Sequence, residues 1–356
     1  MKGVFRLPGA ALAGSVVLFF AVLHGGPPAA PLPLAAGRQA DVGQVTTVRF
    51  LAFGDVNLAR RLGQRLVEGD TLYPFEGVKD TLSTYDVVFA NLESNISEQH
   101  GRTEDPKSNV VFTAPPAAAR ALQRAGITVV STANNHALDF GLRALRETLA
   151  SLDSAGVAHA GTAVDRAALY RPAIVTVRGF RCAFFAVTDI MNGGGDEWKR
   201  WVAAADTALI FPAVRKIRGN VDLVVLSFHG GEEYAEVASE RTRWFARAAL
   251  DNGVDIFLGH HPHVPYGIEV RGRGIAVHSL GNFVFKQPGR FWTEHGYALS
   301  CTLTRAGGAA NVGEIRILPL RAGFQPVFVT ERDELQKVYD RVRTLSQQQA
   351  WERLKW

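Results

Sequence analysis

Side chains of the kinds that bind metal ions recur along the chain, each shortly after an apolar run. They are Asp55, Glu93, Asn135, His136, His229, His261 and His263. Carboxylate oxygens, an amide oxygen and imidazole nitrogens suit Zn²⁺, Mn²⁺ or Fe and match soft Cu(I) poorly. We therefore expect these residues to form a site for one or two divalent metal ions.

The segment His260-His261-Pro262-His263 is the strongest local signal for such a site. His261 and His263 are two residues apart, so an extended chain would point both imidazoles the same way, and Pro262 restricts the backbone between them. A pH-sensitive loop without a metal is the alternative interpretation. The similar groups elsewhere in the chain favour the metal site.

The apolar runs predict the strands that must position these groups. Strands are predicted at 48–53, 85–91, 127–132, 221–228 and 254–258. In open α/β sheets, ligands bind beyond the carboxyl ends of the strands. The polar groups that follow these strands should therefore converge on one crevice.

Helices are predicted between the strands. They lie at 115–125, 142–155 and 239–252. Gly156 is expected to end the second helix, and Ser239 is expected to cap the start of the third. The alternation of strands and helices indicates an α/β fold, and predicted hairpins at 171–187 and 268–285 indicate that its sheets are mixed.

The composition limits the classes of function. The chain has 356 residues, of which 47% are hydrophobic and 21% charged, as is typical of a globular protein. Its formal net charge is +5, and the Lys and Arg residues are scattered, which argues against a nucleic-acid partner. A mild positive charge fits an anionic substrate or an anionic membrane surface. The sequence has no phosphate-binding loop or dinucleotide-binding glycine motif.

The cysteines, Cys182 and Cys301, both lie in apolar runs that resemble strands. Neither has the spacing of a zinc finger or of a redox CxxC motif. Two buried free thiols are the favoured expectation. A single disulfide is the alternative if the domain is exported.

Residues 1–24 predict export, because Lys2 and Arg6 precede an uncharged apolar run. A cleaved signal peptide and an uncleaved signal anchor are both open, and a buried core helix is the third interpretation. Either export signal would place the rest of the chain outside the cytoplasm. The predicted organisation continues with a Pro/Ala/Gly-rich linker at 25–44, one folded domain at 45–330 and an amphipathic helix at 331–356.

Several longer motifs surround the candidate site residues. They are Gly54-Asp55, Asn91-Leu92-Glu93, Asn134-Asn135-His136-Ala137-Leu138-Asp139, Phe228-His229-Gly230, His261-Pro262-His263 and Leu280-Gly281-Asn282-Phe283. In these motifs the chain resembles the CapA/PgsA family of poly-γ-glutamate capsule synthesis proteins. The resemblance covers roughly 48–285. It implies a metallophosphoesterase-like α/β fold, a four-layer α/β/β/α sandwich with mixed sheets. It also implies an anionic polymer or a small anionic substrate as partner, and a possible membrane complex that makes the polymer.

The resemblance also implies roles for single residues. The metal ligands would be Asp55, Glu93, Asn135, His229, His261 and His263. His136 would lie over the leaving group as the catalytic residue. Asp139 would either orient the His136 ring or cap the helix that follows; both roles are open. The expected substrate contacts are Asn57, Arg60, His260 and Asn282.

The chain departs from the metallophosphoesterase pattern at its first metal position. That pattern has a histidine two residues after the first aspartate, where this chain has Asn57, and Glu93 stands where the pattern has a bridging aspartate. Asparagine is a neutral and weaker ligand, so a single-metal site is as open as a two-metal site. Residues 232–234, after His229, either support the site or form a solvated loop.

Three functions are compatible with these features. In the first, a metal-activated water attacks the carbonyl of an amide or the phosphorus of a phosphoester. In the second, the protein is a non-catalytic accessory factor that holds a polyanion during polymer synthesis or export. In the third, it is a metallophosphoesterase or nucleotidase, for which Phe291 and Trp292 are the nearest candidates to hold a base.

Overall fold

The computed structural model describes residues 46–305 and 310–355. The predicted export segment at 1–24 and the linker at 25–44 lie outside the described residues. Within the described ranges, no helix combines the length and the apolar character that a membrane crossing requires.

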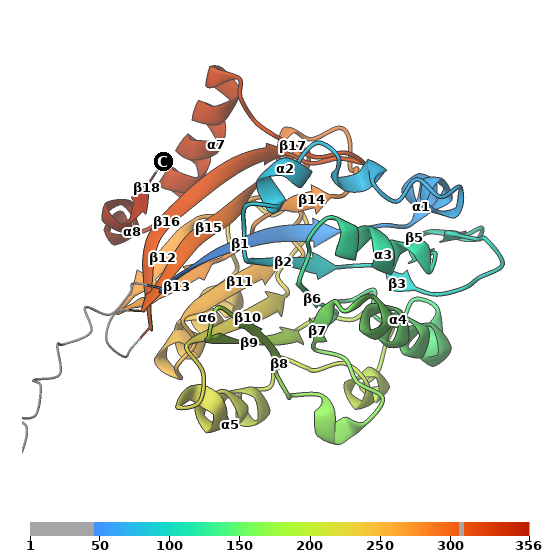
Figure 1. Ribbon diagram of the computed structural model, residues 1–356, viewed down its shortest axis with the longest axis horizontal. Helices are drawn as coiled ribbons and strands as arrows, with labels where there is room; N and C mark the ends of the chain where they lie inside the picture. The colour runs from blue at the N-terminus through green and yellow to red at the C-terminus, as the bar shows by residue number, and fades with distance from the viewer. Residues whose placement is uncertain (1–45, 306–309, 356) are drawn as a thin grey trace, which may run out of the picture. The chain divides into compact units, whose positions relative to one another are not determined.

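The first large sheet joins strands from both ends of the chain (Figure 1). Its spatial order is β17 (Val327–Phe328), β16 (Ala310–Arg321), β15 (His295–Arg305), β1 (Thr46–Val56), β2 (Val87–Leu92), β6 (Val129–Ser131) and β7 (Ala158–Ala160). Two short strands, β14 (Asn282–Val284) and β18 (Leu354–Lys355), pair with β1 and β16. Strands β1, β2, β6 and β7 are parallel, whereas β15 is antiparallel to β1 and β16.

The second large sheet is also mixed. Its order is β12 (Ile268–Arg271), β13 (Gly274–Val277), β11 (Ile256–His260), β10 (Leu223–His229), β9 (Phe180–Thr188) and β8 (Ala173–Val177). The four inner strands are parallel, and the two edge strands are antiparallel to their neighbours. A small separate sheet contains β3 (Asn95–Ile96), β5 (Ser108–Ala114) and β4 (Glu104–Asp105).

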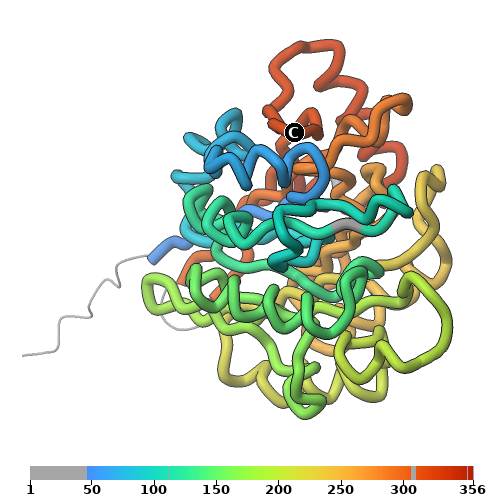
Figure 2. The backbone as a smooth tube through the Cα atoms, turned by 90° about the vertical axis from the view of Figure 1, so that its right-hand side faces the viewer, coloured from blue at the N-terminus to red at the C-terminus, as the bar shows by residue number. Residues whose placement is uncertain are grey.

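The two large sheets pack face to face and are covered by helices. Phe50 and Phe89 of the first sheet share one buried cluster with Phe184 and Leu258 of the second. The other face of the first sheet packs against α1 (Arg60–Val67), α2 (Lys79–Leu82), α3 (Ala117–Arg124) and α4 (Gly141–Ala155). The other face of the second sheet packs against α5 (Thr207–Arg218) and α6 (Glu240–Asp251). The expected four-layer α/β/β/α sandwich with mixed sheets is confirmed. In Figure 2, the segments that carry α1, α3 and α4 face the viewer.

Several local predictions are confirmed. Gly156 ends α4 with a left-handed φ of 71°, which a residue without a Cβ adopts at little cost. The Ser239 side chain caps α6 by accepting a hydrogen bond from Thr242 N. The hairpin predicted at 171–187 is the antiparallel pair β8 and β9.

Two predictions are wrong in part. The single helix expected at 331–356 is divided into α7 (Arg332–Thr344), α8 (Gln348–Arg353) and β18. The break occurs because Ser346 Oγ and Gln347 N form hydrogen bonds with the backbone of Ile268, on β12. The hairpin expected at 268–285 ends with β13, and β14 leaves it to join the first sheet beside β1.

Candidate metal centre

The carboxyl ends of parallel strands from both sheets supply the polar side chains. Asp55 lies near the end of β1, and Glu93 follows β2. His229 and His260 are the last residues of β10 and β11, and they are paired in register. Asn135 follows β6. Strand topology therefore brings together groups that are far apart in the sequence.

A close approach between two glycines fixes the position of Asp55. Asp55 N donates a 3.1 Å hydrogen bond to the carbonyl oxygen of Gly281. A Cβ atom added to Gly54 would lie 1.7 Å from that same oxygen. Glycine is therefore required at position 54 for β1 to reach the loop before β14. The resulting register places Asp55 opposite Asn282.

Asp55 is fully buried and is surrounded by nitrogen atoms. Its Oδ1 accepts a 2.9 Å hydrogen bond from Asn91 Nδ2 and lies 3.3 Å from His260 Nδ1. Its Oδ2 lies 3.3 Å from His263 Nδ1. Burial acts to raise the pKa of Asp55, but the imidazoles of His260 and His263 outweigh it and hold the pKa well below its usual value. Asp55 is thus a charged carboxylate.

Glu93 is almost fully buried and has an unsatisfied oxygen. Its Oε1 lies 3.3 Å from Asn91 Nδ2 and 3.6 Å from His229 Nδ1. Its Oε2 has no hydrogen-bond partner among the described residues. Burial and the nearby charge of Asp55 raise the pKa of Glu93 well above its usual value. A buried carboxylate oxygen of this kind is costly unless a proton or a cation satisfies it.

His229 and His261 face each other, with ring centroids 4.9 Å apart. His229 Nε2 lies 2.8 Å from Asn135 Oδ1, and His261 Nδ1 has no partner in the described part of the chain. Burial, reinforced by neighbouring imidazoles, lowers the pKa of His229 and brings that of His261 to about 3. Both rings are therefore neutral at ordinary pH, which is the form that binds a metal.

These donor atoms fit a divalent cation. One ligand atom each from Asp55, Glu93 and His263 lie within 4.8 Å of one another, and so do those of Glu233, His261 and His263. Carboxylate and imidazole donors suit Zn²⁺, Mn²⁺ or Fe. Among the described residues, Glu93 Oε2, His261 Nδ1 and both ring nitrogens of His260 have no hydrogen-bond partner, and a bound cation would satisfy atoms of this kind.

His136 lies beside Asn135 and contacts Asp139. Its Nδ1 is 2.8 Å from Asp139 Oδ2, and its backbone N donates to Asn134 Oδ1 at 3.1 Å. Phe140 is the N-cap residue of α4, and no side-chain hydrogen bond from this residue caps the helix. Of the two roles expected for Asp139, the geometry supports the orientation of His136. A proton on Nδ1, donated to Asp139, makes Nε2 the atom available for proton transfer.

Arg60 is the expected substrate contact whose placement fits that role best. It is half-buried and has a left-handed φ of 57°. Its guanidinium donates a hydrogen bond to Asn109 O, and Asp139 and Tyr234 lie close enough to interact with its charge. Burial lowers the pKa of Arg60. Arg60 therefore places positive charge beside the His136–Asp139 pair.

Two other expected substrate contacts, Asn57 and His260, are buried. Asn57 Oδ1 accepts a 2.9 Å hydrogen bond from Ala59 N, so this side chain stabilises a turn after β1. His260 Nδ1 lies 3.3 Å from Asp55 Oδ1, and neither ring nitrogen of His260 has a hydrogen-bond partner among the described residues. The expected contact of Asn57 and His260 with a substrate stays a prediction.

Asn282 is likewise fully used inside the protein. Its Oδ1 lies 2.9 Å from His263 Nδ1, and its Nδ2 donates to Gln287 Oε1 and Thr293 O. These contacts hold the His263 ring so that Nε2 faces Glu93, 4.0 Å from Oε2. Asn282 therefore orients the His263 ring, as is common around metal-binding histidines, and its expected contact with a substrate stays a prediction.

Sequence reasoning did not assign a role to Asn91 or Asn192. Asn91 Nδ2 lies 2.9 Å from Asp55 Oδ1 and 3.2 Å from His229 Nδ1. Its place at the end of an apolar strand was a usable signal. Asn192 Oδ1 accepts a 3.0 Å hydrogen bond from Asn135 Nδ2. It lies in an irregular glycine-rich loop with no pattern to mark it.

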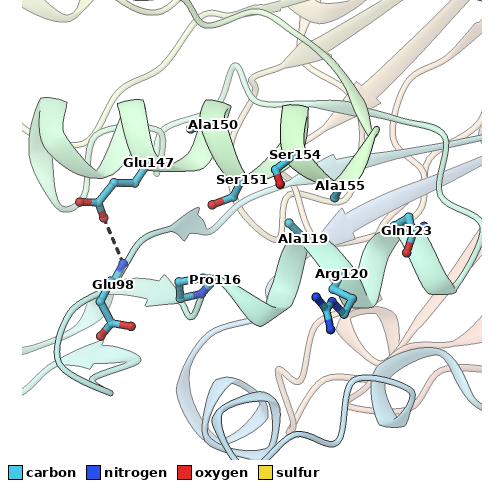
Figure 3. Close-up of a pocket in the computed structure, with 10 residues that line it drawn as sticks. All are labelled: Glu98, Pro116, Ala119, Arg120, Gln123, Glu147, Ala150, Ser151, Ser154 and Ala155. Carbon is cyan, nitrogen blue, oxygen red and sulfur yellow. Dashed lines mark hydrogen bonds between the residues drawn. The ribbon is translucent and has the colours of Figure 1, made fainter.

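A groove of about 550 Å³ lies elsewhere, between α3 and α4 (Figure 3). Its lining includes Arg120, Ser151 and Glu147, whose carboxylate accepts a 3.0 Å hydrogen bond from Glu98 N. None of the expected site residues lines this groove. It is therefore separate from the candidate metal centre.

Comparisons with known proteins point to one family. The family model described as "Bacterial capsule synthesis protein PGA_cap" matches residues 49–287. A capsule biosynthesis protein CapA of Bacillus anthracis is 32% identical over 66% of this chain and 59% of its own length. A PGA biosynthesis protein CapA of Bacillus subtilis is 30% identical over 66% of this chain and 62% of its own. The match therefore spans about six tenths of these two relatives. A probable polyglutamine synthesis accessory protein of Mycobacterium tuberculosis is 28% identical over 82% of each chain.

Proposed function

Because the chain belongs to the family of bacterial capsule synthesis proteins, we propose that it is a metal-dependent hydrolase or transferase that acts in the synthesis or export of capsule poly-γ-glutamate. One observation carries the proposal. Glu93 Oε2 and His261 Nδ1 are buried without a hydrogen-bond partner among the described residues, and both residues belong to groups whose ligand atoms lie within 4.8 Å of those of other carboxylates and imidazoles. Several buried charged groups and unpartnered polar atoms lie together here, whereas buried polar groups in a structural core are normally hydrogen-bonded.

The reaction would be the cleavage or transfer of an amide or a phosphoester bond. A divalent cation held by Asp55, Glu93, Asn135, His229, His261 and His263 would polarise the carbonyl or phosphoryl oxygen of the substrate. Water, or in a transfer the acceptor group of a second substrate, would form the new bond to the carbonyl carbon or the phosphorus as the bond to the leaving group breaks. A doubly protonated His136, oriented by Asp139 through Nδ1, would give its Nε2 proton to the leaving group. The guanidinium of Arg60 would bind a carboxylate or phosphate of the anionic substrate.

The predicted export segment at 1–24 supports a location outside the cytoplasm, either membrane-anchored or secreted. In that location the protein could act within a membrane complex that makes or exports the polymer. Fractionation of cells that produce the full chain would test this part of the proposal. Recovery only in the cytosol would contradict it.

A non-catalytic accessory factor is the second candidate. The relative from Mycobacterium tuberculosis is named as a probable accessory protein, which favours this candidate. So does Asn57, which stands where the metallophosphoesterase pattern has a histidine. The His136–Asp139 contact favours the enzyme, because a binding module has no need of an oriented imidazole.

A nucleotidase is less well supported. Phe291 stacks on His295 with ring centroids 3.9 Å apart. Trp292 packs under the guanidinium of Arg341 at 4.5 Å. Both aromatic rings are therefore already in contact with the protein, and neither is an obvious clamp for a base.

The test uses the purified full chain loaded with Mn²⁺ or Zn²⁺. Turnover is measured on a γ-glutamyl peptide and on bis(p-nitrophenyl) phosphate. For the variant His136→Ala we expect a loss of about 10²–10⁴-fold in kcat with metal content unchanged. The control is His159→Ala, a histidine outside the site that pairs with Asp153, and it should behave as wild type. Metal binding without turnover of either substrate, together with normal capsule formation by His136→Ala in cells, would favour the accessory factor.

A further inference from the structure

Glu233 brings a third carboxylate to the candidate metal centre. It lies on the loop after β10 and is exposed, whereas His261 and His263 are buried. One carboxylate oxygen of Glu233 and one nitrogen of each histidine lie within 4.8 Å of one another. Sequence reasoning left open whether this loop supports the site or is only solvated. The geometry of the loop favours a role in the site.

The backbone ties the Glu233 loop to the histidine loop on both sides of Glu233. Gly230 N donates a 3.2 Å hydrogen bond to His260 O, and Tyr234 N donates a 2.9 Å hydrogen bond to Pro262 O. Tyr234 adopts a left-handed φ of 62°, which a residue with a side chain rarely adopts. The backbone on both sides of Glu233 is therefore fixed against the histidine loop, which keeps the Glu233 carboxylate within reach of the histidines.

A second observation points to a ligand at the same place. His261 is 7% exposed, and its Nδ1 has no hydrogen-bond partner in the part of the chain that the structure describes. Its φ of 95° is strained, and strain of this kind is kept where the surrounding structure needs one orientation of a side chain. His261, with an unsatisfied ring nitrogen, and the nearby carboxylate of Glu233 are therefore suited to bind one cation together.

One metal-binding donor of the metallophosphoesterase pattern is missing from this chain. Asn57 stands where the metallophosphoesterase pattern has a histidine, and its Oδ1 is used by Ala59 N. We propose that Glu233 is a metal ligand that acts with His261 and His263 from the solvent side of the centre and adds a donor to a site that lacks the histidine of the pattern. The inference rests on the proposed metal-dependent function. A carboxylate with imidazoles selects a divalent cation such as Mn²⁺ or Zn²⁺.

The test measures metal binding by the full chain, with Mn²⁺ alone and then with Zn²⁺ alone. Equilibrium dialysis gives the number of ions and their affinities for wild type, Glu233→Gln and Glu232→Gln. Glu232 is the matched control, because it is the adjacent exposed glutamate and removing it changes the net charge equally. For Glu233→Gln we expect the loss of one ion or an affinity at least about ten-fold weaker. Glu232→Gln should stay within about two-fold of wild type.

Three outcomes would overturn the inference. Glu233→Gln could match wild type while Glu93→Gln loses its ions; Glu233 is then not a ligand, and the proposed function stands. Glu232→Gln could weaken binding as much as Glu233→Gln, which would show only a general charge effect. Wild type could bind neither Mn²⁺ nor Zn²⁺, which would overturn the proposed function together with this inference.

Discussion

The side-chain amide of Asn135 donates a 3.0 Å hydrogen bond to Oδ1 of Asn192. This contact decides which end of the Asn135 amide faces His229, because it leaves Oδ1 2.8 Å from His229 Nε2. An amide binds a cation through its oxygen, which is the acceptor, and not through its NH₂ group. Asn192 therefore orients the Asn135 amide so that its oxygen faces His229, as the proposed role of Asn135 as a metal ligand requires.

Replacement of Asn192 by alanine should weaken metal binding, because the Asn135 amide could then turn its nitrogen toward the centre. The expected loss is about 10–100-fold in affinity for Mn²⁺ or Zn²⁺. Asn192→Asp keeps an oxygen that can accept from Asn135 Nδ2 and should retain most of the affinity. Metal titration of the two variants checks this. Equal affinities for Asn192→Ala and Asn192→Asp would remove the orienting role.

The residues that meet at the candidate site could be predicted as a group because several of them follow apolar strands. Asp55, Glu93 and His229 are near strand ends, and parallel strands bring their carboxyl ends to one edge. Asn192 could not be found in this way. Its loop is held by isolated bridges between distant segments, such as Thr188 with Ala204, which leave no periodic pattern in the sequence.

Features of the fold that depend on nearby residues could be predicted from the sequence. Features that depend on contacts between distant segments could not. Gly156 and Ser239 act within a few residues of themselves, so their sequence signals were sufficient. The break after α7 depends on Ser346, whose hydroxyl accepts from Ile268 N far away in the chain. Hydrophobic periodicity alone continues through such a break. The helix α5, which contains Pro212, was not predicted.

Gly54→Ala should destabilise the protein strongly. The new Cβ would lie 1.7 Å from Gly281 O, a backbone atom that cannot turn away as a side chain could. We expect a loss of about 3 kcal/mol or more in the free energy of unfolding, measured with urea. Gly219→Ala is the control, since nothing lies within 4 Å of its added Cβ, and it should change stability by less than about 0.5 kcal/mol. Similar midpoints for both variants would contradict the close approach.

Cys182 and Cys301 are free and buried, as the sequence indicated. Burial raises the pKa of the Cys182 thiol to about 12 and also raises that of Cys301. Because the thiolate is the reactive form, neither should react with Ellman's reagent in the native protein at pH 8. Both should react after unfolding in guanidinium chloride without a reductant. A thiol that reacts before unfolding, or none after it, would disagree with two buried free cysteines.

Glu269 should make stability depend on pH. It is 4% exposed on β12 and accepts a 2.7 Å hydrogen bond from Arg247 Nε, with His278 Nε2 3.7 Å away. Burial acts to raise the pKa of Glu269, but His278 and Arg247 outweigh it and lower the pKa from 4.5 to about 2. A carboxyl group whose pKa is lowered by folding stabilises the folded state at pH values above the pKa that it has in the unfolded chain. That contribution is lost as the pH falls from about 4.5 toward 2.

Glu269→Gln should therefore be less stable than wild type at pH 7, by about 1 kcal/mol because Arg247 is partly solvated. The difference should shrink as urea unfolding is repeated between pH 5 and pH 2, since wild-type Glu269 becomes protonated there. Glu68 is exposed and lies at the C-terminal end of α1. Glu68→Gln is therefore the control, and its stability should differ little from that of wild type at any pH. A Glu269→Gln deficit that stays constant down to pH 2 would mean that Glu269 acts through its shape and packing and not through its charge.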